Sequence, residues 1–216
     1  MADTGATSPG TAADDDTIGT KAWTDVDNIK LDDGNYARAA TSFDPGWTSH
    51  YLKATNFGFT IPGGATINGI LVEIEERDGG STGKITDNVV SLLDENGALT
   101  GDNKAKVPAW TAVTTYEDYG GAADDWNAGL SAANINDGDF GVVLSVDEVD
   151  DNFATASVDH IQITVYYTAA AAGTNMKINI GDVWKDVESM KINIGDVWKD
   201  VAEVKQNIGD AWKVVY

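Results

Sequence analysis

Cysteine is absent from the 216-residue sequence, and histidine occurs only twice, as His50 and His160. Without thiols the chain has no disulfide framework, no cysteine nucleophile and no Cys-ligated zinc site. Neither histidine lies in a recognisable catalytic motif, and the sequence contains no P-loop, dinucleotide fingerprint or zinc motif. We therefore expect structural roles for both histidines and no enzymatic activity.

Positive charge is scarce, because 14 Lys and Arg side chains stand against 35 Asp and Glu, for a formal net charge of −21. Nucleic-acid backbones and anionic membrane surfaces would repel such a chain, so neither is expected as a partner. The sequence also lacks the ~18 consecutive apolar residues that a membrane-spanning helix requires. Residues 1–16 have neither the basic nor the apolar region of a secretion signal, so none is expected.

The negative charge is concentrated in one part of the chain. Residues 1–167 hold 28 acidic and 8 basic side chains, a charge of −20, whereas residues 168–216 hold 7 and 6, a charge of −1. This change predicts a domain boundary near residue 168, and the Ala- and Gly-rich residues 168–175 are expected to be a linker. Residues 1–16 are mostly small and polar, which predicts a flexible or anchoring N-terminal arm.

Residues 17–167 carry the pattern of antiparallel β-strands. Residues 70–75 and 160–167 alternate apolar with more polar side chains, which is typical of strands that are buried on one face. Shorter runs of this kind, separated by turns rich in Gly, Asp and Asn, lie at residues 36–41, 50–61, 89–93 and 140–146. The predicted fold class is therefore all-β, with an antiparallel, jelly-roll-like β-sandwich.

Residues 176–216 are a tandem repeat with a period of 14 residues. The units are MKINIGDVWKDVES, MKINIGDVWKDVAE and the shorter VKQNIGDAWKVVY. A Gly-Asp pair in each unit suits the two-residue loop of a type II′ β-hairpin. This register places Asn179 opposite Trp184, Lys177 opposite Asp186 and Ile180 opposite Val183. We expect the three hairpins to form a six-stranded meander.

The meander would have one aliphatic face and one face with a row of Trp and Asn. A small sheet without a second layer is marginally stable, and an exposed Trp row leaves a large apolar area in water. The module is therefore expected to bind copies of itself as a trimeric prism, or another protein. The predicted interface consists of Trp184, Trp198, Trp212, Asn179, Asn193, Asn207, Ile178, Ile180, Ile192 and Ile194.

Acidic turns in the sandwich offer the oxygen ligands that Ca²⁺ prefers. The weak candidates are Asp32, Asp33, Asp137 and Asp139. The spacing of an EF-hand is absent, and solvated acidic turns explain these residues equally well. No other cofactor is expected.

Four tryptophans lie in or near the predicted loops, namely Trp23, Trp47, Trp110 and Trp126. Aromatic side chains of this kind can form platforms for sugars. Four scattered tryptophans do not define a platform, however, so we favour the interpretation that they fill the ends of the sandwich.

Residues 49–70, 139–142 and 158–167 resemble a β-sandwich module of tailed-phage structural proteins and bacterial surface proteins. The Asn-Ile-Gly-Asp-Val-Trp-Lys repeats are similar to short tandem units of phage structural proteins. The resemblance implies a virion accessory protein, either a capsid decoration or cement protein, a head fibre or a tail-associated component. Its implied partners are a major capsid or tail protein, and its implied location is the virion, assembled in the host cytoplasm and exposed after release. The alternative is a host-surface glycan- or protein-binding module of a phage tail or a cell-surface protein.

Overall fold

The computed structural model describes residues 1–40, 46–80, 84–149 and 154–170, together with six strands between residues 177 and 214. The chain divides into two units, Met1–Ala169 and Ala170–Tyr216. The boundary between them lies within residues 168–175, where the sequence predicts a linker.

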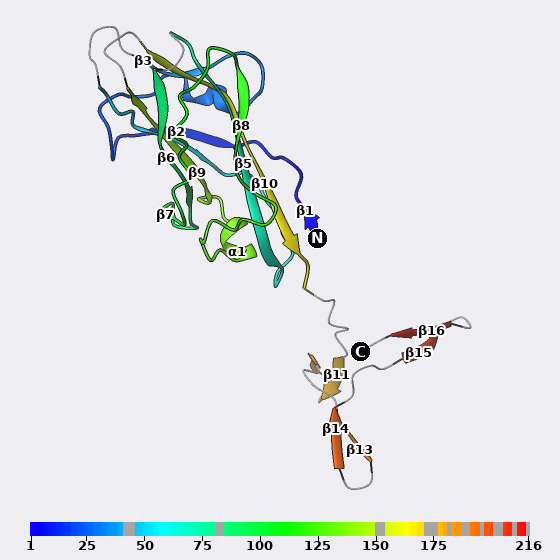
Figure 1. The fold of residues 1–216 in the computed structure, drawn as a ribbon. Coiled ribbons are helices and arrows are strands. Elements are labelled where there is room, and N and C mark those ends of the chain that lie inside the picture. The colour runs from blue at the N-terminus through cyan, green and yellow to red at the C-terminus, as the bar shows by residue number, and fades with distance from the viewer. Residues whose placement is uncertain are drawn as a thin grey trace. The chain divides into compact units, whose positions relative to one another are not determined.

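The first unit consists of two five-stranded antiparallel sheets (Figure 1). One sheet contains β1 (Ala2–Asp3), β3 (Ala37–Ala40), β10 (Thr155–Thr168), β5 (Thr66–Asp78) and β8 (Thr115–Gly121). The other contains β2 (Thr11–Asp15), β4 (Tyr51–Thr55), β9 (Gly141–Glu148), β6 (Ile85–Leu93) and β7 (Leu99–Thr100).

In the described part of this unit, helix is confined to two short segments, the 3₁₀ helix η1 (Val26–Ile29) and α1 (Ala132–Ile135). Among the described residues no helix is long and apolar enough to cross a bilayer.

The pairing of the strands is that of a jelly roll. β3 pairs with β10, β4 with β9, β5 with β8 and β6 with β7, as in one long antiparallel hairpin. This hairpin is rolled up, because β10 also pairs with β5 and β9 also pairs with β6. The predicted all-β, jelly-roll-like sandwich is confirmed.

The alternation in the two longest strands positions the core. Three apolar residues of β5 are fully buried and lie directly opposite three fully buried residues of β10: Ile74 opposite Ile161, Val72 opposite Ile163 and Ile70 opposite Val165. Burial of an aliphatic side chain of this size contributes about 1.5–3 kcal/mol. A register shift of one residue would turn these side chains to the solvent, so the burial also fixes the register.

The N-terminal residues are part of the sandwich, whereas the sequence predicts a flexible or anchoring arm over residues 1–16 and a sandwich over residues 17–167. β1 pairs with β10, and β2 pairs with β4 in the opposite sheet, so this segment passes from one sheet to the other. Gly10 allows the passage, because a Cβ atom there would lie 2.8 Å from the backbone oxygen of Asn56. The contacts are largely between backbone N–H and C=O groups, which a composition poor in apolar side chains does not reveal.

The second unit contains three hairpins with the same register. They are β11 (Lys177–Ile180) with β12 (Val183–Asp186), β13 (Lys191–Ile194) with β14 (Val197–Asp200), and β15 (Lys205–Ile208) with β16 (Ala211–Val214). The predicted opposition of Asn179 to Trp184 and of Lys177 to Asp186 is confirmed.

The described strands of this unit form three two-stranded sheets rather than a continuous six-stranded meander, so that part of the prediction is wrong. A two-residue loop fixes the register within a hairpin locally. Nothing comparable in the sequence fixes how one hairpin pairs with the next.

Candidate functional site

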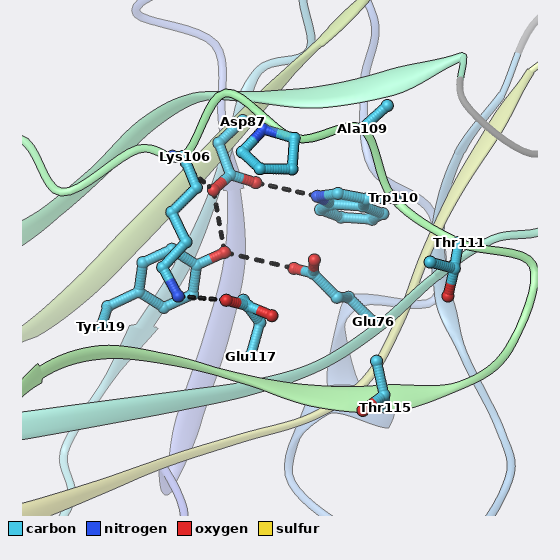
Figure 2. A pocket seen from close by; sticks show the side chains of 10 residues that line it. Glu76, Asp87, Lys106, Ala109, Trp110, Thr111, Thr115, Glu117 and Tyr119 are labelled. Atoms are coloured by element: carbon cyan, nitrogen blue, oxygen red, sulfur yellow. Dashed lines mark hydrogen bonds and ion pairs between the residues drawn. The ribbon is translucent and has the colours of Figure 1, made fainter.

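A cavity of about 220 Å³ opens in the jelly-roll unit beside Trp110 (Figure 2). Glu76 reaches it from β5, Asp87 from β6, and Glu117 and Tyr119 from β8. The connection between β7 and β8 supplies Lys106 and the segment from Pro108 to Thr111. Both sheets therefore contribute side chains to one cavity.

Two strand features bring the carboxyl groups inward. Glu76 occupies the next inward position after the buried residues Ile70, Val72 and Ile74, and it is 6 % exposed. Asp87 immediately precedes a register shift in the pairing of β6 with β9. A shift of this kind redirects side chains, so that Asp87 faces the cavity although Val90 beyond it also lies in the core.

Hydrogen bonds join the side chains of the cavity. Asp87 accepts hydrogen bonds from Trp110 Nε1 at 2.8 Å, from the Tyr119 hydroxyl at 2.9 Å and from the Lys106 backbone N–H at 2.9 Å. The Tyr119 oxygen also lies 3.4 Å from Glu76 Oε2, and Lys106 forms an ion pair with Glu117. Asp87 is thus the acceptor at the centre of the network.

The buried carboxyl groups differ from ordinary ones in their acidity. Burial, reinforced by the charges of Asp87 and Glu117, raises the pKa of Glu76 to about 9. Glu76 is therefore a neutral carboxylic acid at pH 7. Burial also raises the pKa of Asp87, although its three donors act in the opposite direction, and burial raises the pKa of Tyr119.

The cavity is suited to binding a small, neutral, hydroxyl-bearing ligand. Its wall combines an indole ring with the side chains of Thr111 and Thr115, whose hydroxyl groups donate to the carbonyls of Val113 and Tyr116. Lys106 and Glu117 are each more than one-third exposed and remain accessible to a ligand. The acceptor atoms of Asp87 are occupied by donors of the protein itself, so Asp87 holds the cavity together rather than facing a ligand.

Three of the four sandwich tryptophans lie outside this cavity. Trp23, Trp47, Trp110 and Trp126 are all buried, with exposed fractions of 4 % or less. The indole N–H of Trp23 donates to the His50 carbonyl at 2.9 Å, and that of Trp126 donates to the Ile70 carbonyl at 2.8 Å. The prediction that the tryptophans fill the sandwich is confirmed, and Trp110 alone among the four lines the cavity.

Both histidines contact side chains that are distant in the sequence. His50 Nδ1 lies 2.9 Å from a carboxylate oxygen of Asp14. The ring of His160 lies between two hydroxyl groups, with Nε2 at 2.8 Å from Ser8 Oγ and Nδ1 at 2.8 Å from the Tyr116 hydroxyl. These contacts attach residues of the N-terminal segment to His50, which directly precedes β4, and to β10, in keeping with the structural roles expected for both histidines.

The four predicted calcium residues have different surroundings. Asp33 accepts a hydrogen bond from the backbone N–H of Asn35 at 3.0 Å, and Asp137 accepts one from that of Asp139 at 2.9 Å. Both arrangements are side-chain-capped turns at the surface. Asp32 is different, because its carboxylate belongs to a cluster with Glu75 and Asp159.

The predicted interface residues occupy equivalent positions in the hairpins. Asn179, Asn193 and Asn207 lie opposite Trp184, Trp198 and Trp212 respectively. Ile178 lies opposite Lys185, and Ile180 opposite Val183. Ile192 and Ile194 have the same partners one repeat later. The burial of these side chains lies outside the described features.

The sequence patterns described above did not predict Glu76, Asp87, Tyr119 or Asp159 as site residues. A usable signal exists for Glu76, because the alternation from Ile70 through Ile74 continues to it and places a carboxyl group on the core face. Asp87 and Asp159 adjoin irregularities in strand pairing, for which the sequence offers no comparable signal.

Comparison of the sequence with protein families and with curated proteins gives no match. Among solved structures, the chain is similar to a family 11 carbohydrate-binding module from Clostridium thermocellum in complex with a β-1,3-1,4-mixed-linked tetrasaccharide. The identity is 13 %, the coverage is 74 % of this chain and 86 % of that one, and the TM-score is 0.35.

Two further solved structures are similar to this chain, with comparable sequence identities and TM-scores. CBM1 of BiXyn10A in its apo form is 11 % identical, with coverage of 73 % and 98 % and a TM-score of 0.36. The family 11 carbohydrate-binding module of the cellulase Lic26A-Cel5E of Clostridium thermocellum is 9 % identical, with coverage of 78 % and 89 % and a TM-score of 0.34. Similarity at this level assigns no ligand and no activity to this chain.

Proposed function

We propose that this protein is a non-enzymatic structural component of a virion, of the capsid decoration, cement or fibre type. In this proposal the C-terminal hairpins hold copies of the chain together as a trimer, and the jelly-roll unit faces the medium. A major capsid or tail protein is the partner on the particle. The resemblance of residues 49–70, 139–142 and 158–167 to phage structural proteins suggests the virion as the location. The hairpins suggest how copies of the chain associate.

The observation that carries the proposal is the threefold repetition of one hairpin. The three units share the same register, and their described strands pair within each hairpin. A two-stranded hairpin is at best marginally stable in water and gains stability from a third strand or a second layer. The edges of such hairpins are also templates for pairing with another chain. Copies of the chain would supply both.

The distribution of charge supports this division of roles. Residues 1–167 carry −20 and residues 168–216 carry −1. Bringing three strongly acidic surfaces together is opposed by repulsion between like charges, whereas three nearly neutral surfaces can meet without that cost. Association through the hairpins therefore keeps the acidic units in the solvent.

Analytical ultracentrifugation of the full chain tests the assembly. We expect a trimer, and we expect the triple variant W184A/W198A/W212A to dissociate. The matched control is V107A, because Val107 is 88 % exposed on the jelly-roll unit. A wild-type chain that sediments as a monomer at micromolar concentrations would contradict the proposal. Mass spectrometry of purified virions tests the placement on a particle. We expect the protein to be detected there, and its absence would contradict the proposal.

The cavity beside Trp110 favours a second function, recognition of a saccharide on a host surface. Sugars combine apolar ring faces with hydroxyl groups, and the cavity offers an indole ring, two threonine side chains and the Lys106–Glu117 pair. A volume of about 220 Å³ lies below the usual range for drug-sized ligands, which favours a single sugar unit.

A glycan array with the full chain tests this second function. We expect saturable binding to one class of glycan that is lost in T115V and K106A. The control is V113A, because Val113 is 72 % exposed and does not line the cavity. The absence of binding across the array, or binding that survives both cavity variants, would exclude recognition at this cavity.

A further inference from the structure

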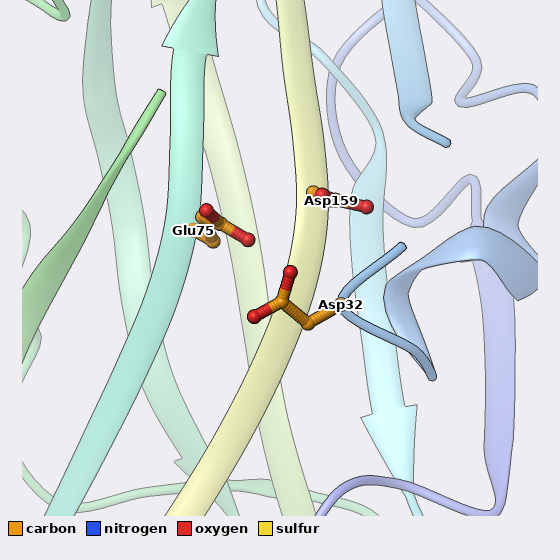
Figure 3. Close-up of side chains that lie close together, drawn as sticks. All are labelled: Asp32, Glu75 and Asp159. Atoms are coloured by element: carbon orange, nitrogen blue, oxygen red, sulfur yellow. The ribbon is translucent and has the colours of Figure 1, made fainter. Parts of the chain in front are cut away.

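Three carboxyl groups from distant segments meet at the outer face of the sheet that contains β5 and β10 (Figure 3). Glu75 lies on β5, Asp159 lies on β10, and Asp32 lies in the loop between η1 and β3. One oxygen of each carboxyl group lies within 4.8 Å of the other two. Side chains 43 and 127 positions along the sequence from Asp32 are thus brought beside it by the fold.

A β-bulge places Asp159 in this cluster. Val158 lies opposite Glu76 and His160 lies opposite Glu75, so Asp159 between them has no residue opposite it. The extra residue of a bulge is turned away from the regular alternation. The side chain of Asp159 is buried, with an exposed fraction of 2 %, whereas that of Asp32 lies at the surface.

Asp159 makes one hydrogen bond and has one oxygen without a partner. Its Oδ2 accepts from the backbone N–H of Gly34 at 2.9 Å, which attaches the loop that contains Asp32 to β10. Its Oδ1 is buried and has no hydrogen-bond partner, and the same is true of Glu75 Oε2. An unpartnered buried carboxylate oxygen is costly, and two of them in one cluster indicate that a positively charged group belongs there.

We propose that Asp32, Glu75 and Asp159 bind a divalent cation, and that this cation is calcium. Two oxygen ligands on opposite sides of one Ca²⁺, each at about 2.3–2.6 Å, are about 4.6–5.2 Å apart. The oxygens of the cluster lie within that span, so one ion can reach all three after at most a small movement of the side chains. The exposed side of Asp32 leaves room for the water ligands that complete the coordination.

The neighbouring groups agree with a hard cation. The Tyr116 hydroxyl donates to Asp32 at 3.2 Å, and it also contacts His160. The carboxyl groups of Asp32 and Asp159 lie beside that of Glu75, so like charges repel one another across the cluster. A bound Ca²⁺ would remove this repulsion and would link the loop before β3 to the two longest strands.

Calcium binding is measured on the full chain after treatment with a chelator, by calorimetric titration and by thermal unfolding. At a calcium concentration about a hundredfold above Kd, we expect the melting temperature to rise by about 5–10 °C. Mg²⁺ is expected to give a smaller shift, because it needs shorter, octahedral coordination and keeps its water ligands. Tb³⁺ is a second probe, since Tyr116 lies close enough to the cluster to sensitise its emission.

Three variants test the assignment of the ligands. D159N, E75Q and D32N are each expected to abolish the calcium-dependent shift, and D32N changes an exposed side chain, so its folding is not at risk. D137N is the matched control, because it removes one charge from an exposed acidic turn outside the cluster.

The proposal is overturned if Ca²⁺ changes neither the melting temperature nor the calorimetric signal, which would mean that Glu75 and Asp159 share a proton instead. A calcium response that D32N and D159N both retain, or an equal response to Mg²⁺, would also overturn it.

Discussion

The two units of this chain differ in how far apart in the sequence their paired strands lie. In the jelly-roll unit, β3 pairs with β10 and β4 with β9, so the chain must bring distant segments together before the core closes. In the C-terminal unit each strand pairs with its neighbour across a two-residue connection. The first unit therefore obtains its stability within one chain. The second has a well-defined register within each hairpin, and in the proposed function copies of the chain supply its stability. The acidic charge lies on the first unit.

The largest expected difference between the units is in the cost of losing one isoleucine side chain. Ile74 is fully buried between the sheets, and I74A is expected to destabilise the jelly-roll unit by about 2–5 kcal/mol. The same change in a hairpin, I194A, is expected to alter the unfolding of the jelly-roll unit by less than about 0.5 kcal/mol. Differential scanning calorimetry resolves the two cases, and similar losses in both variants would contradict the separation into two units.

The second prediction concerns Glu76, a carboxyl group at a core position. Its pKa is about 9 in the folded protein and 4.5 ordinarily, so between these values the folded state holds a proton that the unfolded state has released. Stability should therefore fall as the pH rises from about 4.5 to about 9. At about 1.4 kcal/mol per pH unit, this costs about 3 kcal/mol at pH 7.

The variant E76Q removes the titration while keeping the shape of the side chain. We expect it to raise the free energy of unfolding at pH 7 by up to about 3 kcal/mol, and to have little effect near pH 4. Urea unfolding across this pH range measures the difference, with D16N as a control at an exposed acidic residue. A variant that is less stable than the wild type at both pH values would show that Glu76 is not protonated.

The smallest predicted effect tests whether the N-terminal segment belongs to the jelly-roll unit. Ser8 Oγ lies 2.8 Å from His160 Nε2, so S8A is expected to cost about 0.5–1.5 kcal/mol. A double-mutant cycle with H160Q isolates the interaction between the two side chains. A coupling energy near zero would indicate that the segment is held by its backbone pairing alone.

The features that sequence predicted are those that depend on local pattern. The alternation at Ile70–Ile74 gives the strand and its buried face, and the Gly-Asp loops give the hairpin register that places Asn179 opposite Trp184. The strands at Ala2–Asp3 and Thr11–Asp15 were missed, because backbone hydrogen bonds to β10 and β4 leave no trace in side-chain character.

The candidate sites were also predicted only where a local pattern was enough. Asp32 was predicted as a calcium ligand from its acidic turn, but its partners Glu75 and Asp159 depend on long-range pairing and on a bulge. Asp87 and Tyr119 meet only because the two sheets pack together. A single sequence contains no period or spacing that brings such residues together.

Hydrogen exchange of the full chain, measured by mass spectrometry at several protein concentrations, tests the comparison of the two units most directly. We expect the amides of the jelly-roll unit to be protected at every concentration. Amides of the strands between Lys177 and Val214 should become protected only as the chains associate into a species of three times 22.8 kDa. Protection of the hairpins that does not depend on concentration would contradict the claim that they are stabilised by copies of the chain.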